Sequence, residues 1–411
     1  MEYVIVGGSA AGLSALKAIR TRDKDGKVTL VTDEPGRPYY RPVVAKVASG
    51  ERAGDDIAFT EEHLEALGVD VVVGRAERLE SSTRELTLVG GKTIGFDRLL
   101  IATGARARSL PIPGADGPGV FTLRTLTDAL RLKDAAANAK DAVVVGCGFV
   151  GVKATEALKR VGLSVTVIEA ATDILQPRLD AKGAGIIRAA IEGAGVKVIT
   201  SDTASEILRE GGVVKGVRAA SGETYPADLV VIAVGVTPNV GFLDGAGLTV
   251  RAGIVTGEGL GTGVQGVYAA GDVAEGTDLV TGAPAVSALW SNACEMGRIA
   301  GSNMAGDKLG YSGFLSVMNA TEIAGVPVVT VGDVTGTGYE RVFGASGRLY
   351  RMLAFDDDVL CGAVFMGELR GAGLYANLVR NRFPLRGLKD KAVEDRLTYA
   401  DFAAAPAAPA A

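Results

Sequence analysis

A short apolar run followed by a glycine-rich turn occurs twice in the chain. The first run is Tyr3–Val6, with Gly7–Gly12 after it. The second is Ala142–Val145, with Gly146–Gly151 after it. After each turn the pattern of apolar residues predicts a helix and then a second buried strand, which together make a βαβ unit of a parallel sheet. The units lie roughly 140 residues apart, so the sequence predicts a duplicated architecture with two separate sheets.

The residues of these turns suit the phosphates of a dinucleotide. The helix that follows a glycine turn offers unpaired backbone N–H groups and the positive end of its dipole to a pyrophosphate. Gly146–Gly151 is a complete GxGxxG, whereas Ser9 stands at the middle glycine of the first turn. One such turn could serve helix–strand packing alone. Two of them, each with an acid after the next strand, favour two bound dinucleotides.

An acidic residue follows the second strand of each unit. Asp33, with Glu34 beside it, lies about 21 residues beyond the first turn, and Glu169 lies about 18 residues beyond the second. A carboxylate at this place accepts hydrogen bonds from ribose hydroxyls and repels a 2′-phosphate. Ala170 and Ala171 follow Glu169, with no arginine. The second unit is therefore predicted to bind NADH in preference to NADPH.

Composition and charge argue against several other classes of protein. A chain of 411 residues suits two or three domains, and 47% hydrophobic residues can fill large cores. The net charge of −5, without a lysine or arginine block, argues against nucleic-acid binding. No apolar run is long enough for a membrane span, and Met1 leads directly into a strand-like segment, so no signal peptide is expected. Three widely spaced cysteines and the single His63 form no metal-binding pattern and fit a reducing cytoplasm.

The order of motifs resembles that of the pyridine-nucleotide:disulfide-type flavin oxidoreductases over roughly residues 1–400. Between the two turns stands Ala102-Thr103-Gly104, and after the second come Leu229–Gly235 and Gly271-Asp272. The chain is most similar to the branch without an active-site disulfide, which holds rubredoxin and ferredoxin reductases and the NADH-binding part of assimilatory nitrite reductase. The resemblance implies an α/β fold of the glutathione-reductase type, with FAD on the first Rossmann-like domain, NAD(H) on the second, and a C-terminal α+β domain.

The resemblance, the sequence patterns and the alanine- and proline-rich composition of the last residues together predict a division of the chain into four parts. The expected parts are a discontinuous FAD-binding domain at 1–110 and 236–308, an NADH-binding domain at 111–235, a C-terminal α+β interface domain at 309–402, and a flexible tail at 403–411. In the C-terminal part, Asp356-Asp357-Asp358 predicts a polar hairpin turn rather than a metal site.

The segment Pro38–Pro42, followed by Lys46, is similar to the PYxRPxLSK segment of the family, with Val44-Ala45 in place of Leu-Ser. The resemblance implies Lys46 near flavin N5, Asp272 on the ribityl chain and Trp290 against the flavin ring. Other readings stay open: Lys46 as a surface lysine, Arg124 paired with a nearby carboxylate, and Trp290 as ordinary core. The candidate FAD-binding residues are Gly7, Gly8, Ser9, Ala10, Ala11, Gly12, Asp33, Glu34, Arg41, Lys46, Ala76, Ala102, Thr103, Gly104, Arg124, Gly271, Asp272 and Trp290.

In the second unit, Phe149 stands where the family places an aromatic side chain over the nicotinamide pocket. Lys153 stands where disulfide reductases carry a glutamate that pairs with the flavin lysine. Three alternatives follow: Lys153 turns away as a helix lysine, an acid such as Glu295 or Glu322 balances it, or it raises the flavin potential. Lys46, Phe149 and Lys153 are the candidate catalytic residues. The remaining candidate cofactor-binding residues are Gly146, Gly148, Phe149, Val150, Gly151, Glu169 and Gly235.

The cysteine that disulfide reductases of this family need opposite the flavin is missing. Residues 33–46 contain no cysteine. Thiol chemistry requires a thiolate at that place, so the sequence disfavours disulfide reductases, CoA-disulfide reductases, and cysteine-based peroxidases or water-forming oxidases. Cys147, Cys294 and Cys361 are interpreted as structural.

The sequence therefore predicts an FAD-dependent NADH:acceptor oxidoreductase. No cysteine cluster for an iron–sulfur centre is present, so the expected electron partner is a separate iron–sulfur, rubredoxin or ferredoxin-type protein. The chain is expected as a homodimer or as a subunit of a hetero-oligomer, with the NADH-handling subunit of a 2-oxoacid oxidoreductase as one possibility. Two alternatives stay open: a flavin NADH oxidase that uses O₂, and a redox-sensing interaction protein of the apoptosis-inducing-factor type. A stand-alone NAD-dependent dehydrogenase would leave the first turn and Gly271-Asp272 without a role.

Overall fold

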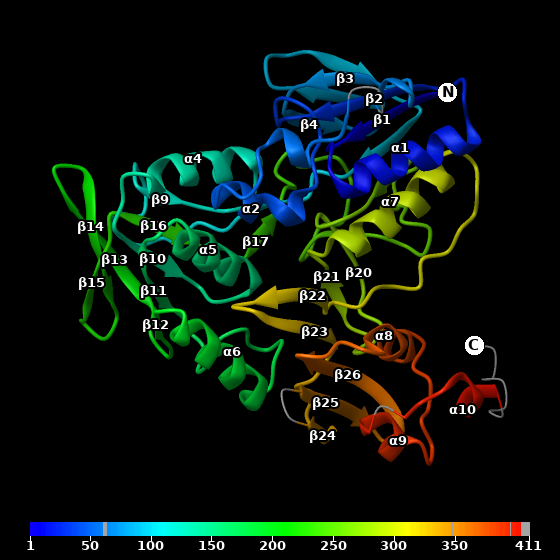
Figure 1. Ribbon diagram of the computed structural model, residues 1–411. Coiled ribbons are helices and arrows are strands. Elements are labelled where there is room, and N and C mark those ends of the chain that lie inside the picture. The colour runs from blue at the N-terminus through cyan, green and yellow to red at the C-terminus, as the bar shows by residue number, and fades with distance from the viewer. Residues whose placement is uncertain (61–63, 347–348, 395, 404–411) are drawn as a thin grey trace. The chain divides into compact units, whose positions relative to one another are not determined.

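A computed structural model describes residues 1–60, 64–346, 349–394 and 396–403 (Figure 1). His63 and residues 404–411 of the expected tail lie outside the described residues. The chain forms two compact units, each built from three segments. Unit 1 comprises Met1–Arg108, Leu123–Lys133 and Gly235–Ser316. Unit 2 comprises Ser109–Thr122, Asp134–Val234 and the chain from Val317 onward.

A parallel sheet with strand order β19-β7-β1-β2-β3 is the centre of unit 1. Its central strands have apolar side chains on both faces, as parallel sheets covered on both sides require, and Val4 and Ile5 are buried. The sheet is made of β1 (Glu2–Val6), β2 (Lys27–Thr32), β3 (Asp70–Val73), β7 (Arg98–Ile101) and β19 (Val267–Ala269).

Helices α1 (Ala10–Arg22) and α7 (Trp290–Met304) pack against each other in unit 1. Two glycines on α7 make the contact possible. A Cβ atom at Gly297 would lie 2.1 Å from the carbonyl oxygen of Ala11, and one at Gly301 would lie 2.4 Å from that of Ala15. The two helix backbones therefore touch directly, and α7 supports the helix that begins at the first glycine turn.

Smaller elements complete unit 1. The strands form an antiparallel sheet of β4 (Ala76–Glu80), β5 (Glu85–Leu88) and β6 (Thr93–Gly95), a pair of β8 (Ala105–Ala107) and β17 (Val236–Pro238), and a sheet of β18 (Ile254–Val255), β20 (Ala274–Thr277) and β21 (Pro284–Val286). The helices are two 3₁₀ turns at Arg41–Val43 and Asp55–Ile57, α2 (Val44–Ala48) and α4 (Leu126–Ala136), the last three residues of which belong to unit 2.

Unit 2 has its own parallel sheet, with strand order β12-β11-β10-β16-β9. Its strands are β9 (Val120–Phe121), β10 (Asp141–Val145), β11 (Ser164–Ile168), β12 (Val196–Ile199) and β16 (Leu229–Ile232). Helices α5 (Phe149–Arg160) and α6 (Ala181–Gly193) follow β10 and β11. An antiparallel sheet of β13 (Ala204–Glu210), β14 (Val213–Ala219) and β15 (Thr224–Pro226) precedes β16.

The C-terminal segment of unit 2 is an antiparallel sheet with strand order β22-β23-β26-β25-β24. Asp357 and Asp358 form the turn between β25 and β26, as the three consecutive acids predicted. The strands are β22 (Met318–Ile323), β23 (Val326–Gly332), β24 (Glu340–Ser346), β25 (Leu349–Asp356) and β26 (Val359–Met366). Helices α8 (Ala372–Arg380), α9 (Lys389–Val393) and α10 (Tyr399–Ala403) follow. The predicted fold class, two Rossmann-like sheets with a C-terminal α+β part, is confirmed.

Candidate functional site

The first glycine turn leads from β1 into α1. Gly7 has φ +119°, and a Cβ atom there would lie 2.1 Å from the carbonyl oxygen of Ala102. A Cβ atom at Gly12 would lie 1.9 Å from the carbonyl oxygen of Gly7. Among the described residues, Ser9 makes no side-chain capping bond to α1, and the first turn of that helix has no acid. The first N–H groups of α1 are thus free of a capping carboxylate or hydroxyl, which is what an incoming pyrophosphate requires.

The second turn has the same construction in unit 2. Gly146 has φ +97°, and a Cβ atom there would lie 2.6 Å from the carbonyl oxygen of Ala233. A Cβ atom at Gly151 would lie 1.9 Å from the carbonyl oxygen of Gly146. Gly148 differs, because no described atom lies within 4 Å of its Cβ position and α5 begins immediately after it, uncapped by a side chain. This open backbone fits the close approach of a phosphate, as the middle glycine of the motif requires.

Glu169, directly after β11, is held at the second turn by two backbone N–H groups. Its Oε2 accepts a hydrogen bond from the Cys147 N–H at 2.5 Å, and its Oε1 accepts one from the Ala171 N–H at 2.8 Å. The carboxylate therefore stands beside the glycine turn in a defined orientation. Each of its oxygens still has a lone pair for a ribose hydroxyl.

The register of the first unit places a different residue at the corresponding position. The N–H of Gly7 donates to Val31 O, and the N–H of Gly146 donates to Ile168 O, both at 2.8 Å. Thr32 thus corresponds to Glu169, and its Oγ1 would lie 3.6 Å from a Cβ atom at Gly8. Sequence reasoning missed Thr32 because counting residues from the glycine turn ignores which strand residues are paired. The candidate Asp33 comes one residue later and is exposed.

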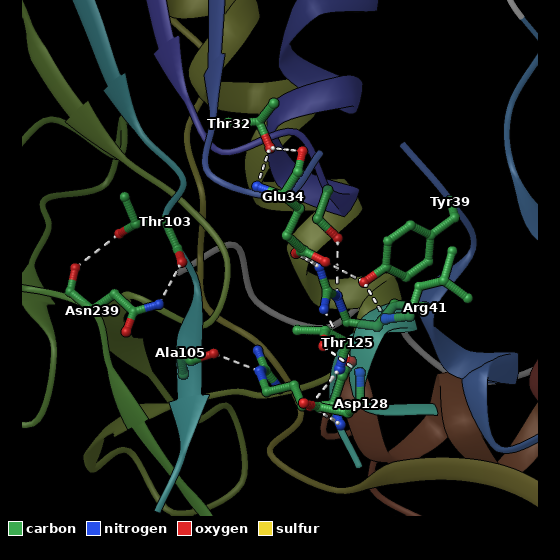
Figure 2. Close-up of polar contacts among 12 residues, drawn as sticks. Thr32, Glu34, Tyr39, Arg41, Thr103, Ala105, Thr125, Asp128 and Asn239 are labelled. Atoms are coloured by element: carbon green, nitrogen blue, oxygen red, sulfur yellow. Dashed lines mark hydrogen bonds and ion pairs between the residues drawn. The ribbon is translucent and has the colours of Figure 1, made fainter. Parts of the chain in front are cut away.

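Glu34 belongs to a polar network in unit 1 (Figure 2). Its carboxylate accepts hydrogen bonds from the Arg41 guanidinium and the Tyr39 hydroxyl. Arg41 also donates to the carbonyl oxygen of Arg124 at 3.0 Å, and Tyr39 accepts a hydrogen bond from the Leu126 N–H at 2.9 Å. Burial, together with the charge of Glu34, raises the pKa of Tyr39. Burial alone would lower the pKa of Arg41, but Glu34 and Tyr39 raise it above its usual value.

Arg124 and Asp272, both candidate FAD-binding residues, form an ion pair. Arg124 Nη2 lies 2.8 Å from Asp272 Oδ2, and the side chains are 20% and 15% exposed. Arg124 also donates to the carbonyl oxygen of Ala105. The pairing of Arg124 with a nearby carboxylate, one of the open readings of the sequence, is what the structure shows. Each side chain neutralises the charge of the other. A polar ligand could therefore bind beside them without leaving an unpaired buried charge.

The Ala102-Thr103-Gly104 turn is held by a residue that sequence reasoning missed, Asn239 (Figure 2). Asn239 Nδ2 donates to Thr103 O, and Thr103 Oγ1 donates to Asn239 O, both at 2.9 Å. Asn239 follows β17, which pairs with β8 just beyond the turn. No motif in the sequence signals this contact, because the two residues are 136 positions apart. Gly271, before Asp272, has φ +79° and a Cβ position 3.1 Å from Ala11 Cβ, so it packs against the start of α1.

The remaining unit 1 candidates lie at the surface or are half-buried. Lys46 is exposed on α2, and Ala76 is half-buried at the start of β4. Trp290 is half-buried at the start of α7 and packs edge-on against Tyr40, with ring centroids 4.9 Å apart and an interplanar angle of 75°. Gly235, with φ +104°, is exposed and accepts a hydrogen bond from the Arg108 N–H at 2.9 Å.

On α5, Phe149 is half-buried, Val150 is 49% exposed, and Lys153 points toward the C-terminal sheet of its own unit. Lys153 Nζ lies 2.7 Å from Glu156 Oε2 and also donates to the backbone carbonyl of Glu322. The acid that pairs with Lys153 is thus Glu156, and Glu322 contributes a carbonyl oxygen instead of its carboxylate. Sequence reasoning considered Glu322 but missed Glu156, although the i, i+3 spacing on a helix is a signal for such a pair.

The three cysteines are free, and Cys147 and Cys361 are buried. Burial, with the charges of Glu169 and Asp173, raises the pKa of the Cys147 thiol to about 12.

Within the described part of the chain, no group of three or more His, Cys, Asp or Glu side chains could hold a metal ion. No helix among the described residues is long and apolar enough to cross a membrane.

Comparisons with known proteins agree with this geometry. Residues 1–297 match the family of pyridine nucleotide-disulphide oxidoreductases. The chain is 32% identical over 406 residues to the epsilon subunit of NADH-dependent phenylglyoxylate dehydrogenase from Aromatoleum evansii, an alignment that covers 96% of this chain and 95% of that one. It is 30% identical over 382 residues to the ferredoxin–NAD(+) reductase component of the biphenyl dioxygenase system of Paraburkholderia xenovorans, covering 92% and 93%.

One solved structure is similar to this chain over most of the length of both proteins. A ferredoxin reductase from Rhodopseudomonas palustris superposes with a TM-score of 0.83 at 28% sequence identity, covering 89% of this chain and 91% of that one. The two glycine turns, the fold and these relatives lead to one assignment. The chain belongs to the pyridine nucleotide-disulphide oxidoreductase family, whose members depend on FAD and NAD(P)H.

Proposed function

We propose that this chain is an FAD-dependent NADH:acceptor oxidoreductase that passes electrons between NAD(H) and an iron–sulfur, rubredoxin or ferredoxin-type protein. The observation that carries the proposal is the pair of glycine turns on separate parallel sheets, each leading into a helix without a side-chain cap. One dinucleotide requires one such turn, so two turns in two units support two dinucleotides. Bound FAD would supply the hydride-accepting and single-electron chemistry.

Named residues of unit 1 have roles in holding FAD under this proposal. The N–H groups at the start of α1 bind the pyrophosphate, Asp272 accepts hydrogen bonds from the ribityl hydroxyls, and Arg124 donates to the cofactor while balancing Asp272. Lys46 is exposed, and no carboxylate among the described residues forms an ion pair with it. Its ammonium is therefore available to stabilise negative charge that develops on the flavin. Trp290, held by Tyr40, covers part of the flavin site.

Unit 2 holds NADH in this proposal, and Glu169 selects it over NADPH. The Glu169 carboxylate is held by the Cys147 and Ala171 N–H groups, so it cannot turn away from a 2′-phosphate without losing both hydrogen bonds. Repulsion from a fixed carboxylate supports NADH as the physiological nucleotide. Phe149, at the start of α5, covers the nicotinamide side of this site.

The names of the related proteins support another protein as the electron acceptor. A ferredoxin–NAD(+) reductase supports a ferredoxin-type partner, and a dehydrogenase subunit for a 2-oxoacid supports a role as the NADH-handling subunit of a complex. The three free cysteines of this chain are far too few and too widely spaced for an iron–sulfur cluster, so the iron belongs to the partner. Free cysteines are also in keeping with a reducing compartment such as the cytoplasm.

Anaerobic stopped-flow mixing of the FAD-loaded protein with NADH tests the proposal. We expect rapid bleaching of the visible flavin band, followed by reoxidation when a ferredoxin or rubredoxin is added. NADPH should bleach the band far more slowly. Failure of NADH to bleach bound FAD would contradict the proposal.

Oxygen consumption as fast as turnover with a protein acceptor would instead identify a flavin NADH oxidase. Negligible turnover with every acceptor, together with NADH-dependent oligomerisation, would identify a redox-sensing interaction protein.

A further inference from the structure

One carboxylate on α5 connects the nucleotide-binding helix to the C-terminal sheet of the same unit. Glu156 Oε2 lies 2.7 Å from Lys153 Nζ, and Glu156 Oε1 accepts a hydrogen bond from the Ala324 N–H at 2.8 Å. Lys153 in turn donates to the carbonyl oxygen of Glu322. The turn between β22 and β23 is therefore held at both a backbone acceptor and a backbone donor. We call Glu156, Lys153 and the 322–325 turn the α5 tether.

The backbone of the turn is shaped to make these contacts. Ala324 has φ +46°, in the left-handed region that residues with a side chain rarely adopt, and Gly325 follows with φ +79°. This conformation directs the Ala324 N–H at Glu156 while the Glu322 carbonyl faces Lys153. Both charged side chains are about one-third exposed, so they are shielded in part from water, and they form one charge-assisted network rather than a freely solvated surface pair.

A second set of contacts joins the same sheet to the start of α6. Asp180 caps α6 by accepting from the Lys182 N–H at 3.2 Å, and it accepts a hydrogen bond from the Tyr350 hydroxyl at 2.6 Å. A Cβ atom at Gly183 would lie 2.9 Å from Met366 Cε, so the helix packs closely on β26. The C-terminal sheet thus holds both helices of the βαβ core that carries the second glycine turn.

We propose that Glu156 is a positioning residue for NAD(H), which acts by holding α5 against the C-terminal sheet. The inference rests on the proposed NADH site at Gly146–Gly151. The tether begins at Lys153, two residues beyond Gly151, on the helix whose first N–H groups bind the phosphates in that proposal. A small displacement of a binding group costs affinity because hydrogen-bond geometry is steep. In this proposal the Lys153 ammonium interacts with Glu156 and with the carbonyl oxygen of Glu322, and it does not stabilise charge on the flavin.

The full-length, FAD-loaded protein with Glu156→Ala, Glu156→Gln and Lys153→Met tests this inference. The dissociation constant of NAD⁺ and the KM and kcat for NADH are the readouts. We expect Glu156→Ala to raise both the NAD⁺ dissociation constant and the KM about tenfold, as the loss of charge-assisted hydrogen bonds predicts, with kcat nearly unchanged. Glu156→Gln keeps an oxygen for the Ala324 N–H, so it should rescue most of the affinity. Lys153→Met should fall between them.

Glu192→Gln is the matched control. Glu192 pairs with Arg188 at 3.0 Å along α6, in the same unit but within a single helix, and its side chain is 44% exposed. This variant should bind NAD⁺ like the wild type. Wild-type protein that binds neither NAD⁺ nor NADH would refute the proposed function itself. Wild-type protein that binds normally, with Glu156→Ala at the same affinity, would overturn the tether alone. A lower melting temperature with unchanged affinity, or a lower kcat with unchanged KM, would overturn it as well.

Discussion

Residues that follow equivalent strands of the two units have different partners although their surrounding motifs look alike. Glu169 is held by backbone N–H groups at its glycine turn. Glu34 is instead paired with the side chains of Arg41 and Tyr39. Backbone N–H groups hold the Glu169 carboxylate beside its glycine turn, whereas the Glu34 carboxylate is engaged by an arginine and a tyrosine side chain that are mostly buried. We therefore expect nucleotide selectivity to depend on Glu169 more than on Glu34.

Replacing Glu169 by alanine should weaken NADH binding and reduce the discrimination against NADPH. Loss of the carboxylate removes the acceptor for the ribose hydroxyls and the repulsion of a 2′-phosphate. The KM for NADH should rise about 10- to 100-fold, as expected for lost hydrogen bonds to a charged group, and that for NADPH should change less. Steady-state kinetics with both nucleotides measures this. Glu223→Gln, on an exposed turn of the same unit, is the control. Equal losses for the two nucleotides would contradict the assigned role.

The Cys147 thiol should resist alkylation although it lies in the second glycine turn. Its pKa is raised to about 12, so the thiolate is scarce at pH 8. The half-buried Cys294 should be labelled first. Because the folded-state pKa lies above the ordinary 9.0, this group stabilises the fold fully below pH 9, and the contribution is lost as pH rises toward 12. Mass spectrometry after iodoacetamide treatment measures the order, and early labelling of Cys147 would contradict it.

At the scale of elements, the contact between α1 and α7 positions the first glycine turn. Gly297 and Gly301 let the α7 backbone meet Ala11 and Ala15 on α1. Ala11 belongs to the turn itself, so the site depends on a helix about 280 residues later in the chain. The pattern after the first glycine turn predicted α1, but not that α7 touches it, because a glycine in a helix carries no information about which backbone approaches it.

Two glycine-to-alanine substitutions in helices should have opposite effects on stability. Gly297→Ala places a methyl group 2.1 Å from a backbone oxygen, so α7 must shift. We expect a loss of about 1–3 kcal/mol in the free energy of unfolding, as for overpacked cores, and weaker FAD retention. Gly185→Ala on α6 meets nothing within 4 Å among the described residues and should add roughly 0.5–1 kcal/mol. Denaturant unfolding compares them, and equal effects would contradict this account.

At the scale of the whole molecule, the chain crosses between its two units several times. Unit 2 gathers the second parallel sheet and the C-terminal sheet into one compact unit. The α5 tether and the Asp180–Tyr350 hydrogen bond join these two sheets. A ligand on the glycine turn of unit 2 therefore acts on a body that includes the C-terminal sheet.

NAD⁺ binding should slow hydrogen exchange in the C-terminal sheet as well as around the glycine turn. Binding stabilises the native state of the whole cooperative unit by mass action, by about 2.7 kcal/mol at a hundred times the dissociation constant. Hydrogen exchange with mass spectrometry should show added protection in β10, α5, β22 and β23. The β4–β6 sheet of unit 1 is the internal reference. Protection confined to residues 134–234 would show that the C-terminal sheet opens independently.

Local sequence was sufficient to predict the strand, glycine turn, helix and second strand of each βαβ unit. These features depend only on residues that are adjacent in the sequence. A glycine turn with positive φ, the start of a helix and an apolar strand can therefore be predicted from short segments of the chain. The absence of a cysteine before Lys46, and with it the absence of a disulfide relay at that place, is likewise a fact of the sequence.

Only the tertiary structure decided which charged groups meet. Arg124 pairs with Asp272 across 148 positions, and Lys153 donates to the backbone carbonyl of Glu322 across 169. The strand register that makes Thr32 the counterpart of Glu169 in the other unit is likewise a property of paired strands. Such contacts depend on how sheets and helices pack, and many distant residues could satisfy the same charge. The sequence by itself determined that two dinucleotide-type turns exist, and the packing within each unit determined which side chains surround its turn.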